Sequence, residues 1–340
     1  MAGAATGAVA TYEAAPNIAL IKYWGVRDEA LGLPYNSSIA VTLGGMRTRT
    51  TVRFDPALPN DRLKLNGRWA VGGPLDSARG FLARVREMAG ERAFAEVRSE
   101  NNFPTASGLA SSASGFAALA GAAALAAGLE LSDTELSRLA RLGSGSACRS
   151  IFGGFVEWRA GRRPDGRDCY ARPLFPPQHW PELIDLVAVV ANAPTKAVRS
   201  SVAMQGSVRS SPAYADWQSV HPGRVTAVRR AIRARDPERL FPLLMEECDD
   251  FRRVCESTVP PLDYLTDTSR AILSAVRALN SERGRPVVGY THDAGAHVHL
   301  FLEERELPAL RRSLRAVPGI ARFWKLRPGP GGRYVRSPVR

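Results

Sequence analysis

Cysteine is scarce in this chain of 340 residues, which has only four copies, Cys148, Cys169, Cys248 and Cys255. No pair has the CxxC spacing of a zinc or redox motif. A chain of this length can form a large core without the help of a disulfide framework. We therefore expect four reduced thiols.

Long apolar segments are also missing. The longest weakly polar run, residues 116–129, consists mainly of Ala, Gly and Leu and is shorter than the roughly 18 residues that a membrane-spanning helix needs. The first twelve residues lack a basic segment followed by an apolar stretch, the pattern of a secretory signal. We expect a chain without a membrane partner and with a cytoplasmic location.

Lysine has only four positions, Lys22, Lys64, Lys196 and Lys325, although the chain is strongly basic. The 46 basic and 33 acidic residues leave a net charge of +13, with a pI of about 10.2. Such a charge suits nucleic acid, a membrane surface or a phosphorylated metabolite. Because nearly all basic residues are Arg, as in a genome-wide codon bias, the total charge does not identify the partner.

The composition is that of an ordinary folded protein, with 45% hydrophobic and 23% charged residues. Apolar patterns predict strands at 17–24, 38–43, 48–54, 183–190, 287–290 and 298–302, and helices at 75–88, 113–129, 225–235, 240–248 and 269–279. Ser132 and Gly143 mark the ends of a further helix. Residues 161–181 are rich in Pro, Gly and Arg, and we expect a loop there.

This alternation of helices and strands predicts an α/β (α+β) protein of two lobes, covering residues 1–185 and 186–325. Residues 326–340 form a basic tail that we expect to be flexible, because the chain end combines basic residues with several Pro and Gly.

A Gly- and Ser-rich segment, residues 104–113, directly precedes the Ala-rich helix. Free amides and the positive end of the dipole at a helix N-terminus favour phosphate. The hydroxyls of Ser111 and Ser112 add groups that can reach phosphate or a bound magnesium ion. The alternative is a small-residue helix that packs closely on a sheet. Neither a Walker loop nor a dinucleotide fingerprint is present.

Two further segments carry candidate chemistry. Residues 143–149 (GSGSACR) offer two hydroxyls and the Arg149 guanidinium, which suits a carboxylate or phosphate; the alternative is a helix cap followed by a surface arginine. Asp293 lies in a turn between two predicted strands, where a carboxylate can accept a proton. His297 and His299 share one strand face and permit a metal site with His292 or Asp293 as the less favoured interpretation.

Taken together, the motifs resemble those of the mevalonate diphosphate decarboxylases of the GHMP kinase superfamily. The matching segments are 17–25 (NIALIKYWG), 36–38 (NSS), 102–112 (NFPTASGLASS), 143–150 (GSGSACRS), 153–158 (GGFVEW) and 293–295 (DAG). They follow the family order from about residue 14 to 320. The resemblance implies a two-lobed GHMP kinase fold, with a ribosomal-S5-domain-2-like, nucleotide-binding N-terminal lobe and a GHMP C-terminal lobe.

The resemblance also implies an ATP-dependent carboxy-lyase, with ATP and Mg2+ as cofactors and a homodimeric assembly. ATP phosphorylates the 3-hydroxyl of a phosphorylated 3-hydroxy acid, and loss of phosphate and carbon dioxide then gives an alkene, isopentenyl diphosphate in the usual case. No metal bound by protein ligands alone is implied, and magnesium enters with ATP.

Individual site residues follow from the same resemblance. The catalytic positions are Asp293, Arg149, Lys196 and Lys22. The substrate-binding positions are Tyr23, Ser144, Ser146 and Ser200. The positions for ATP and magnesium are Ser99, Pro104, Gly108, Leu109, Ala110, Ser111 and Ser112.

The sequence departs from the family pattern at positions that the resemblance assigns to binding the substrate's phosphates, and near Asp293. Val26 replaces a phosphate-binding Lys, Ser201 stands where several bacterial relatives have Arg, and Ala296-His297 replaces Pro-Asn. One missing charge-assisted contact weakens binding by about 1.5 to 3 kcal/mol unless Arg27 or Arg199 replaces it. Three substrates stay open, in decreasing order of preference: mevalonate 5-diphosphate, its monophosphate and a non-mevalonate 3-hydroxy acid.

Two other functions compete with decarboxylation. A GHMP small-molecule kinase would stop after phosphorylation, but Asp293 and Arg149 are both retained. A basic RNA-binding protein would cluster arginine and aromatic residues on one sheet face. We expect no nucleic-acid partner, because the arginines are scattered over predicted helices and loops.

Overall fold

The strands of the N-terminal half form two separate sheets in a computed structural model, which describes residues 8–103, 111–194 and 198–335. The six-stranded sheet has the order β16-β1-β6-β9-β7-β8 and contains β1 (Val9–Ala14), β6 (Thr48–Asp55), β7 (Arg62–Leu65), β8 (Arg68–Trp69), β9 (Phe94–Asn101) and β16 (Arg333–Val335). The four-stranded central sheet has the order β11-β10-β5-β2 and contains β2 (Asn17–Ile21), β5 (Ser38–Thr42), β10 (Phe155–Trp158) and β11 (Ala171–Phe175). A short hairpin pairs β3 (Val26–Asp28) with β4 (Leu33–Pro34).

Three helices cover one face of the six-stranded sheet, namely α1 (Gly73–Ala89), α2 (Ser111–Ala126) and α3 (Asp133–Gly143). The Ala-rich helix α2 lies against β1 and β6, because its small side chains permit a close approach. A Cβ at Gly121 would overlap the Tyr12 ring of β1. This tight packing fixes the N-terminus of α2 relative to the sheet.

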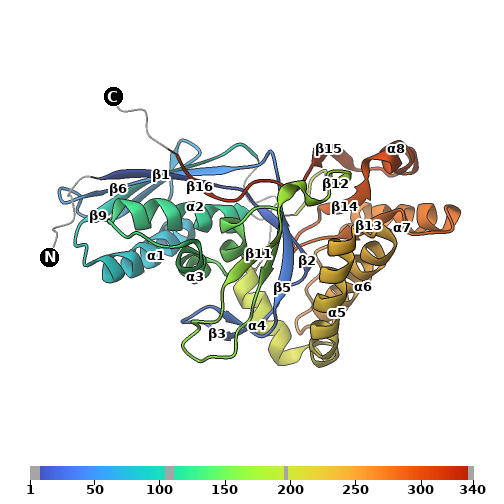
Figure 1. The fold of residues 1–340 in the computed structure, drawn as a ribbon, viewed down its shortest axis with the longest axis horizontal. Helices are drawn as coiled ribbons and strands as arrows, with labels where there is room; N and C mark the ends of the chain where they lie inside the picture. Colours follow the sequence, from blue (N-terminus) through green and yellow to red (C-terminus); the bar gives the residue numbers. More distant parts are fainter. Residues whose placement is uncertain (1–7, 104–110, 195–197, 336–340) are drawn as a thin grey trace.

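The C-terminal half forms a third sheet with helices on both faces (Figure 1). Its order is β13-β14-β12-β15, with β12 (Leu183–Val190), β13 (Val288–Thr291), β14 (Val298–Glu303) and β15 (Ile320–Leu326). One face packs on α7 (Asp267–Glu282) and α8 (Leu307–Leu314), and the other on α5 (Tyr214–Ala234), α6 (Pro237–Glu256) and the central sheet. Helix α4 (Ser200–Ser210) and three short 3-10 helices (Gly145–Ile151, Pro177–His179 and Glu304–Glu306) complete the described elements.

The central sheet joins the two lobes. Its strands β2 and β5 contribute Ile18, Leu20 and Val41 to an apolar core that also contains Val187 of β12 and Phe241 of α6. Because β2 ends in this interface, the residue that follows it lies between groups from both lobes. The position of this residue, Lys22, allows it to contact side chains of the C-terminal lobe.

The predicted strands and most predicted helices are confirmed, with small shifts at their ends. Ser132 and Glu135 form the capping box at the start of α3. Helices α5 and α6 begin earlier than expected, because buried contacts along both helices offset the cost of Pro222 and Pro242. The predicted loop 161–181 contains strand β11, whose Pro173 is tolerated because β11 is an edge strand.

The expected flexible tail is instead structured as far as Val335. Strand β16 pairs with β1, and Pro328 forms an isolated bridge with Leu43. Gly329 and Gly331 contact the backbone near Gly44 and Gly153 so closely that neither site leaves room for a Cβ. The chain after β15 therefore returns to the N-terminal lobe.

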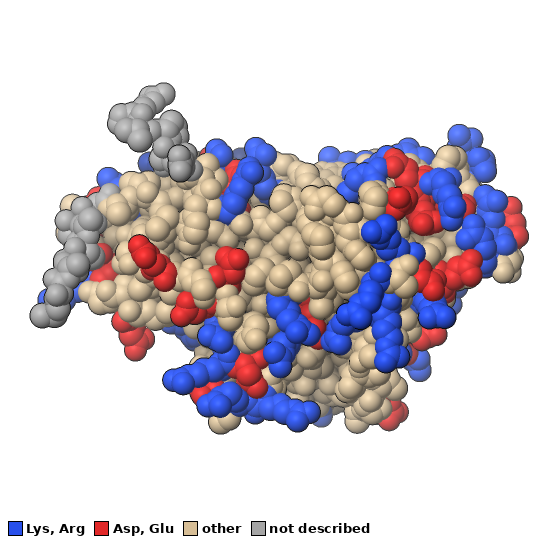
Figure 2. Space-filling view, in the orientation of Figure 1, with Lys and Arg blue, Asp and Glu red and all other residues tan. Residues whose placement is uncertain are grey.

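Arginines also line the face of the six-stranded sheet opposite its helices, contrary to the expectation that they lie on helices and loops. Glu13 there is paired with Arg49 and Arg333, and Glu96 with Arg62 and Arg98. On the face visible in Figure 2, basic and acidic side chains are interspersed among other residues. These four arginines are thus held in ion pairs with Glu13 and Glu96.

All four cysteines are free and buried. Within the described residues, no helix combines the length and the apolar character that a membrane crossing requires.

Candidate active site

A buried ion pair joins the two lobes at the end of β2. The Lys22 ammonium donates to Oδ1 of Asp293 over 2.9 Å, and the two residues are 271 positions apart in the chain. The Lys22 side chain is only 2% exposed, whereas that of Asp293 is 29% exposed. The carboxylate can therefore be reached by a substrate while its ammonium partner cannot.

The Asp293 carboxylate is surrounded by positive groups. Burial, the largest single influence, would raise the pKa of Asp293, but the charge and hydrogen bond of Lys22, together with His299 and Arg149, lower it below the ordinary value. Asp293 is therefore ionised near neutral pH. Because a carboxylate with a lowered pKa is a weak base, it is suited to accept a hydrogen bond and to stabilise positive charge.

The histidines around Asp293 have protein partners. Nδ1 of His292 donates to the Asp293 carbonyl oxygen over 2.7 Å, and Nδ1 of His297 accepts from the Val190 amide over 3.2 Å. His299 lies 2.7 Å from the buried Asp185 carboxylate. In the part of the chain that the structure describes, no three His, Cys, Asp or Glu side chains converge as a metal site.

Arg149 lies in the 3-10 helix after α3 and is 3% exposed, so the alternative of a surface arginine is wrong. Nε donates to Oδ1 of Asn17 over 2.9 Å, and NH1 donates to the Ser38 hydroxyl over 2.6 Å. Burial lowers the pKa of Arg149, while the Asp293 carboxylate counteracts that effect. Among the described residues, these contacts occupy two of five N–H donors, which leaves donors for a substrate anion.

An aromatic platform lies beside Arg149. The rings of Tyr23 and Trp158 meet edge to face at 4.6 Å, and the Arg149 guanidinium lies 6.0 Å from the Trp158 ring. A Cβ at Gly145 would approach both rings within 2.8 Å, so only glycine fits there. Ser144 and Ser146 flank Gly145, and the structure therefore brings these predicted substrate residues together.

Of the predicted nucleotide residues, Ser99, Ser111 and Ser112 lie in described parts of the N-terminal lobe. Ser111 and Ser112 form the first turn of α2, which contains no acidic residue that would neutralise the positive helix end. The Ser99 hydroxyl is hydrogen-bonded to Thr50 within the sheet over 2.8 Å. Pro104, Gly108, Leu109 and Ala110 lie outside the described residues.

The C-terminal lobe contributes fewer of the predicted residues. Ser200 is the first residue of α4 and is half-buried. The predicted catalytic Lys196 lies outside the described residues.

Several residues that hold the site in place were not assigned a role from the sequence. Asn17 and Ser38 orient Arg149, Trp158 supports it, and Glu247 binds the Lys22 amide. The sequence pattern around Glu247 could have indicated its role. Glu247 lies on the apolar face of α6 between Leu244 and Phe251, where a carboxylate needs a partner.

A carboxylate, an ammonium and a guanidinium brought together from two lobes are typical of an enzyme that handles a small anion, and the N-terminus of α2 is suited to phosphate. The chain has the GHMP kinase fold, which it shares with solved structures over nearly its whole length.

Comparison with known sequences identifies the family. Residues 14–171 match the diphosphomevalonate decarboxylase-like N-terminal domain, and residues 186–325 match the mevalonate 5-diphosphate decarboxylase C-terminal domain. The diphosphomevalonate decarboxylase of Schizosaccharomyces pombe is 40% identical over 97% of this chain and 86% of the relative. That of Homo sapiens is 43% identical over 86% of this chain and 76% of the relative. The chain belongs to the diphosphomevalonate decarboxylase family.

Solved structures agree with this assignment. The mevalonate diphosphate decarboxylase of Enterococcus faecalis superposes with a TM-score of 0.89 at 36% identity, over 98% of this chain and all of that one. The enzyme of Trypanosoma brucei gives 0.87 at 34% identity, over 97% and 98%. A complex of MDDEF with MVAPP, AMPPCP and magnesium gives 0.90 at 36% identity, over 98% and 100%.

Replacement of His292 by Phe tests the electrostatics beside Asp293. Burial and then the Lys22 ammonium lower the pKa of His292 to about 4, and burial lowers that of His297 to about 4 as well. Both lie below the ordinary 6.5, so the unfolded chain binds more protons and the free energy of unfolding falls as pH drops from about 6.5 to 4. Each group contributes at most about 1.4 kcal/mol per pH unit.

The free energy of unfolding is measured with denaturant at several pH values between 5 and 6.5. It should fall less steeply with decreasing pH in His292→Phe than in the native protein. Carboxylates with a lowered pKa, such as Glu13 and Glu96, lose their contribution only below about pH 4.5, outside this window. An unchanged slope would show that His292 is not held neutral.

Proposed function

We propose that this protein catalyses the ATP-dependent decarboxylation of mevalonate 5-diphosphate to isopentenyl diphosphate, a step of isoprenoid biosynthesis. The observation that carries the proposal is the partly exposed, ion-paired Asp293 carboxylate within electrostatic reach of the buried Arg149, in a chain whose two lobes both match the family. A carboxylate and a guanidinium facing one space suit a substrate with a hydroxyl and a carboxylate on neighbouring carbons.

In the first step, the 3-hydroxyl oxygen attacks the γ-phosphorus of ATP, the bond between that phosphorus and the bridging oxygen of ADP breaks, and the hydroxyl proton passes to the transferred phosphoryl group. Asp293 accepts a hydrogen bond from the hydroxyl and directs its oxygen toward the phosphorus. The Lys22 ammonium keeps the carboxylate ionised and fixes its direction. Lys196 is proposed to contact the phosphoryl group in transfer, a role that rests on the family resemblance.

In the second step, the bond between the tertiary carbon and the oxygen of its new phosphate group breaks, and positive character builds up on that carbon. The Asp293 carboxylate stabilises that charge. The C–C bond to the substrate carboxylate then breaks, its electron pair forms the alkene, and carbon dioxide leaves. Arg149, oriented by Asn17 and Ser38, holds the departing carboxylate in place.

The nucleotide is proposed to bind at the N-terminus of α2. The uncompensated positive end of this helix and the hydroxyls of Ser111 and Ser112 fit a triphosphate. Magnesium would enter with ATP and supply charge neutralisation to the phosphates. MVAPP, AMPPCP and magnesium are present together in the related MDDEF complex.

The local structure at Val26 bears on the substrate's phosphate count. Val26 packs beside an apolar cluster around Trp24 and receives a hydrogen bond from Gln205 on its carbonyl oxygen. The exposed Arg27 and Arg199 side chains lie in the same region, and the Arg199 guanidinium contacts the start of α1. Either can supply the missing charge to a terminal phosphate, and we therefore favour the diphosphate.

The other departures from the family pattern have structural explanations of their own. Ala296 is buried and its carbonyl oxygen accepts from the Ser269 hydroxyl over 2.6 Å, while His297 accepts from Val190. Ser201 is exposed on the first turn of α4. The cytoplasmic location expected from the sequence and the homodimer implied by the resemblance complete the proposal.

Incubation with ATP and magnesium identifies the substrate when mevalonate, its 5-phosphate and its 5-diphosphate are compared. We expect the 5-diphosphate to give ADP, phosphate and carbon dioxide in equal amounts and to have the highest kcat/KM. ADP without carbon dioxide would identify a kinase instead. Preference for the 5-phosphate would show that no arginine replaces the charge missing at Val26, and turnover of none would favour a different 3-hydroxy acid.

Asp293→Asn and Arg149→Ala should each lower kcat by at least about 100- to 1000-fold, the usual effect of removing an electrostatic stabiliser. Asp165→Asn is a matched control, because Asp165 is also in an ion pair, with Arg163, but lies in an exposed loop. Thermal unfolding verifies that all three variants fold. Native activity in Asp293→Asn would exclude the mechanism.

A further inference from the structure

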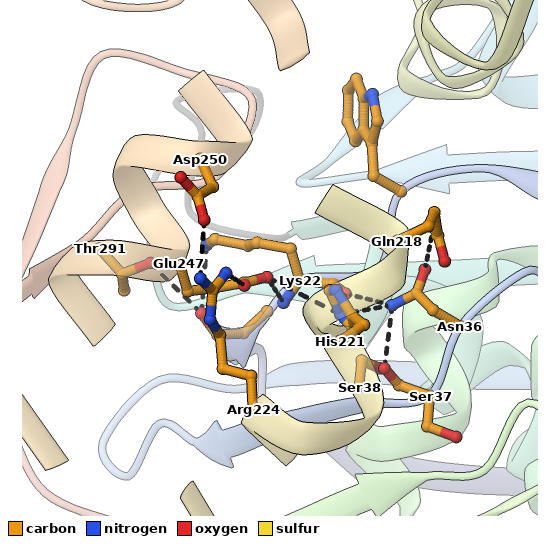
Figure 3. A network of polar contacts seen from close by, with 12 residues as sticks. Lys22, Asn36, Ser37, Ser38, Gln218, His221, Arg224, Glu247, Asp250 and Thr291 are labelled. Atoms are coloured by element: carbon orange, nitrogen blue, oxygen red, sulfur yellow. Dashed lines mark hydrogen bonds and ion pairs between the residues drawn. The ribbon is translucent and has the colours of Figure 1, made fainter. Parts of the chain in front are cut away.

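The backbone of Lys22 is bound from both sides by polar side chains. Lys22 follows the last residue of β2, and its amide donates to Oε1 of Glu247 over 2.9 Å. Its carbonyl oxygen accepts from the Asn36 side-chain amide over 2.7 Å and lies 3.1 Å from Nε2 of His221. Figure 3 shows these groups converging on Lys22 from α5, α6 and the segment before β5.

The carboxylate that binds the Lys22 amide is itself held in a fixed orientation. Glu247 is fully buried, and its Oε2 accepts from NH1 of Arg224 over 2.6 Å. NH2 of the same arginine donates to Asp250 over 2.7 Å. A planar guanidinium bound at two carboxylates permits little rotation. The orientation of Glu247 is therefore fixed, with one oxygen accepting from Arg224 and the other from the Lys22 amide.

The Lys22 side chain transmits this placement to Asp293. Its ammonium lies between the Ala19 carbonyl oxygen, at 3.1 Å, and Asp293, at 2.9 Å. The other charged or titratable groups around the Asp293 carboxylate are Arg149 from the 3-10 helix, His299 of β14 and the neighbouring His292. Lys22 has the largest effect of these groups on the pKa of Asp293.

We propose that Glu247, held by Arg224, is a positioning residue that sets the backbone of Lys22 and so aligns its ammonium with Asp293. The inference rests on the proposed function, because it assigns Glu247 to the geometry of that same site. Glu247 itself does not touch the substrate in this scheme. It acts through the catalytic lysine.

The competing explanation is that Glu247 only joins the lobes. The chain offers a matched control in Glu157 of β10, which is also buried and whose two oxygens also accept from separate donors, here Arg172 and Arg229. Arg229 belongs to α5, so this cluster also connects the central sheet with the C-terminal lobe. None of its three members contacts Lys22 by a hydrogen bond or ion pair recorded for the described residues.

The experiment compares Glu247→Gln with Glu157→Gln. A glutamine has one acceptor oxygen and one donor nitrogen, so at position 247 it can satisfy Arg224 or the Lys22 amide but not both. The same swap at position 157 loses one arginine contact. Thermal unfolding, kcat, KM and the pH dependence of kcat are measured for both variants and the native protein.

We expect both variants to lose thermal stability, and only Glu247→Gln to lower kcat, on the order of 10- to 100-fold, with little change in KM. The acid limb of the pH profile of kcat should also move to higher pH in this variant, because a misaligned ammonium no longer lowers the pKa of Asp293. Native kcat and an unmoved acid limb in Glu247→Gln would overturn the proposal, as would an equal loss of kcat in Glu157→Gln.

Two further measurements keep the proposal testable. If Glu247→Gln does not fold, Asn36→Ala removes the donor on the Lys22 carbonyl and should move the acid limb in the same direction. If the native protein has no decarboxylase activity, the proposed function fails. Titration of 13C-labelled aspartates by NMR, with Asp293→Asn for assignment, then still reports whether Glu247→Gln raises the pKa of Asp293; an unchanged pKa would refute the positioning role.

Discussion

The buried ion pair between Lys22 and Asp293 is the interaction on which the rest of the site depends. Removing an ammonium from water is costly, and a carboxylate at 2.9 Å offsets that cost only when both groups are held accurately. Strand β2 carries Lys22 to the lobe boundary, and the turn before β14 carries Asp293 to the same place. The ion pair therefore forms only when the two lobes are correctly placed relative to each other.

The electrostatics of the pair also define the kind of catalysis that the site can perform. A carboxylate with a lowered pKa does not readily take a proton from an alcohol, but it orients a hydroxyl and stabilises a developing positive carbon. In the proposed mechanism the buried Arg149 complements it by holding the substrate carboxylate. Preorganised charge thus accounts for the proposed phosphorylation and for the loss of carbon dioxide that follows.

Sequence patterns were sufficient where local physics decides the outcome. The apolar run of β12 and the capping box at Ser132 predicted their elements correctly. Strand β11 was missed because its Pro and Arg content resembles a loop, and α5 begins before Pro222 because buried contacts outweigh the proline. Arg149 and Asp293 were predicted as site candidates from their local motifs, and Lys22 through the family resemblance. Their pairing was not predicted, because a contact across 271 residues leaves no local pattern.

The most direct test of the central claim is a double-mutant cycle on kcat/KM for ATP-dependent carbon dioxide release, with Lys22→Met, Asp293→Asn and the double variant. Residues that act as one unit have strongly non-additive effects. The account predicts that the double variant is about as slow as Asp293→Asn alone, since the ammonium acts through the carboxylate. Losses that multiply in the double variant would show that the two groups act independently and would contradict the account.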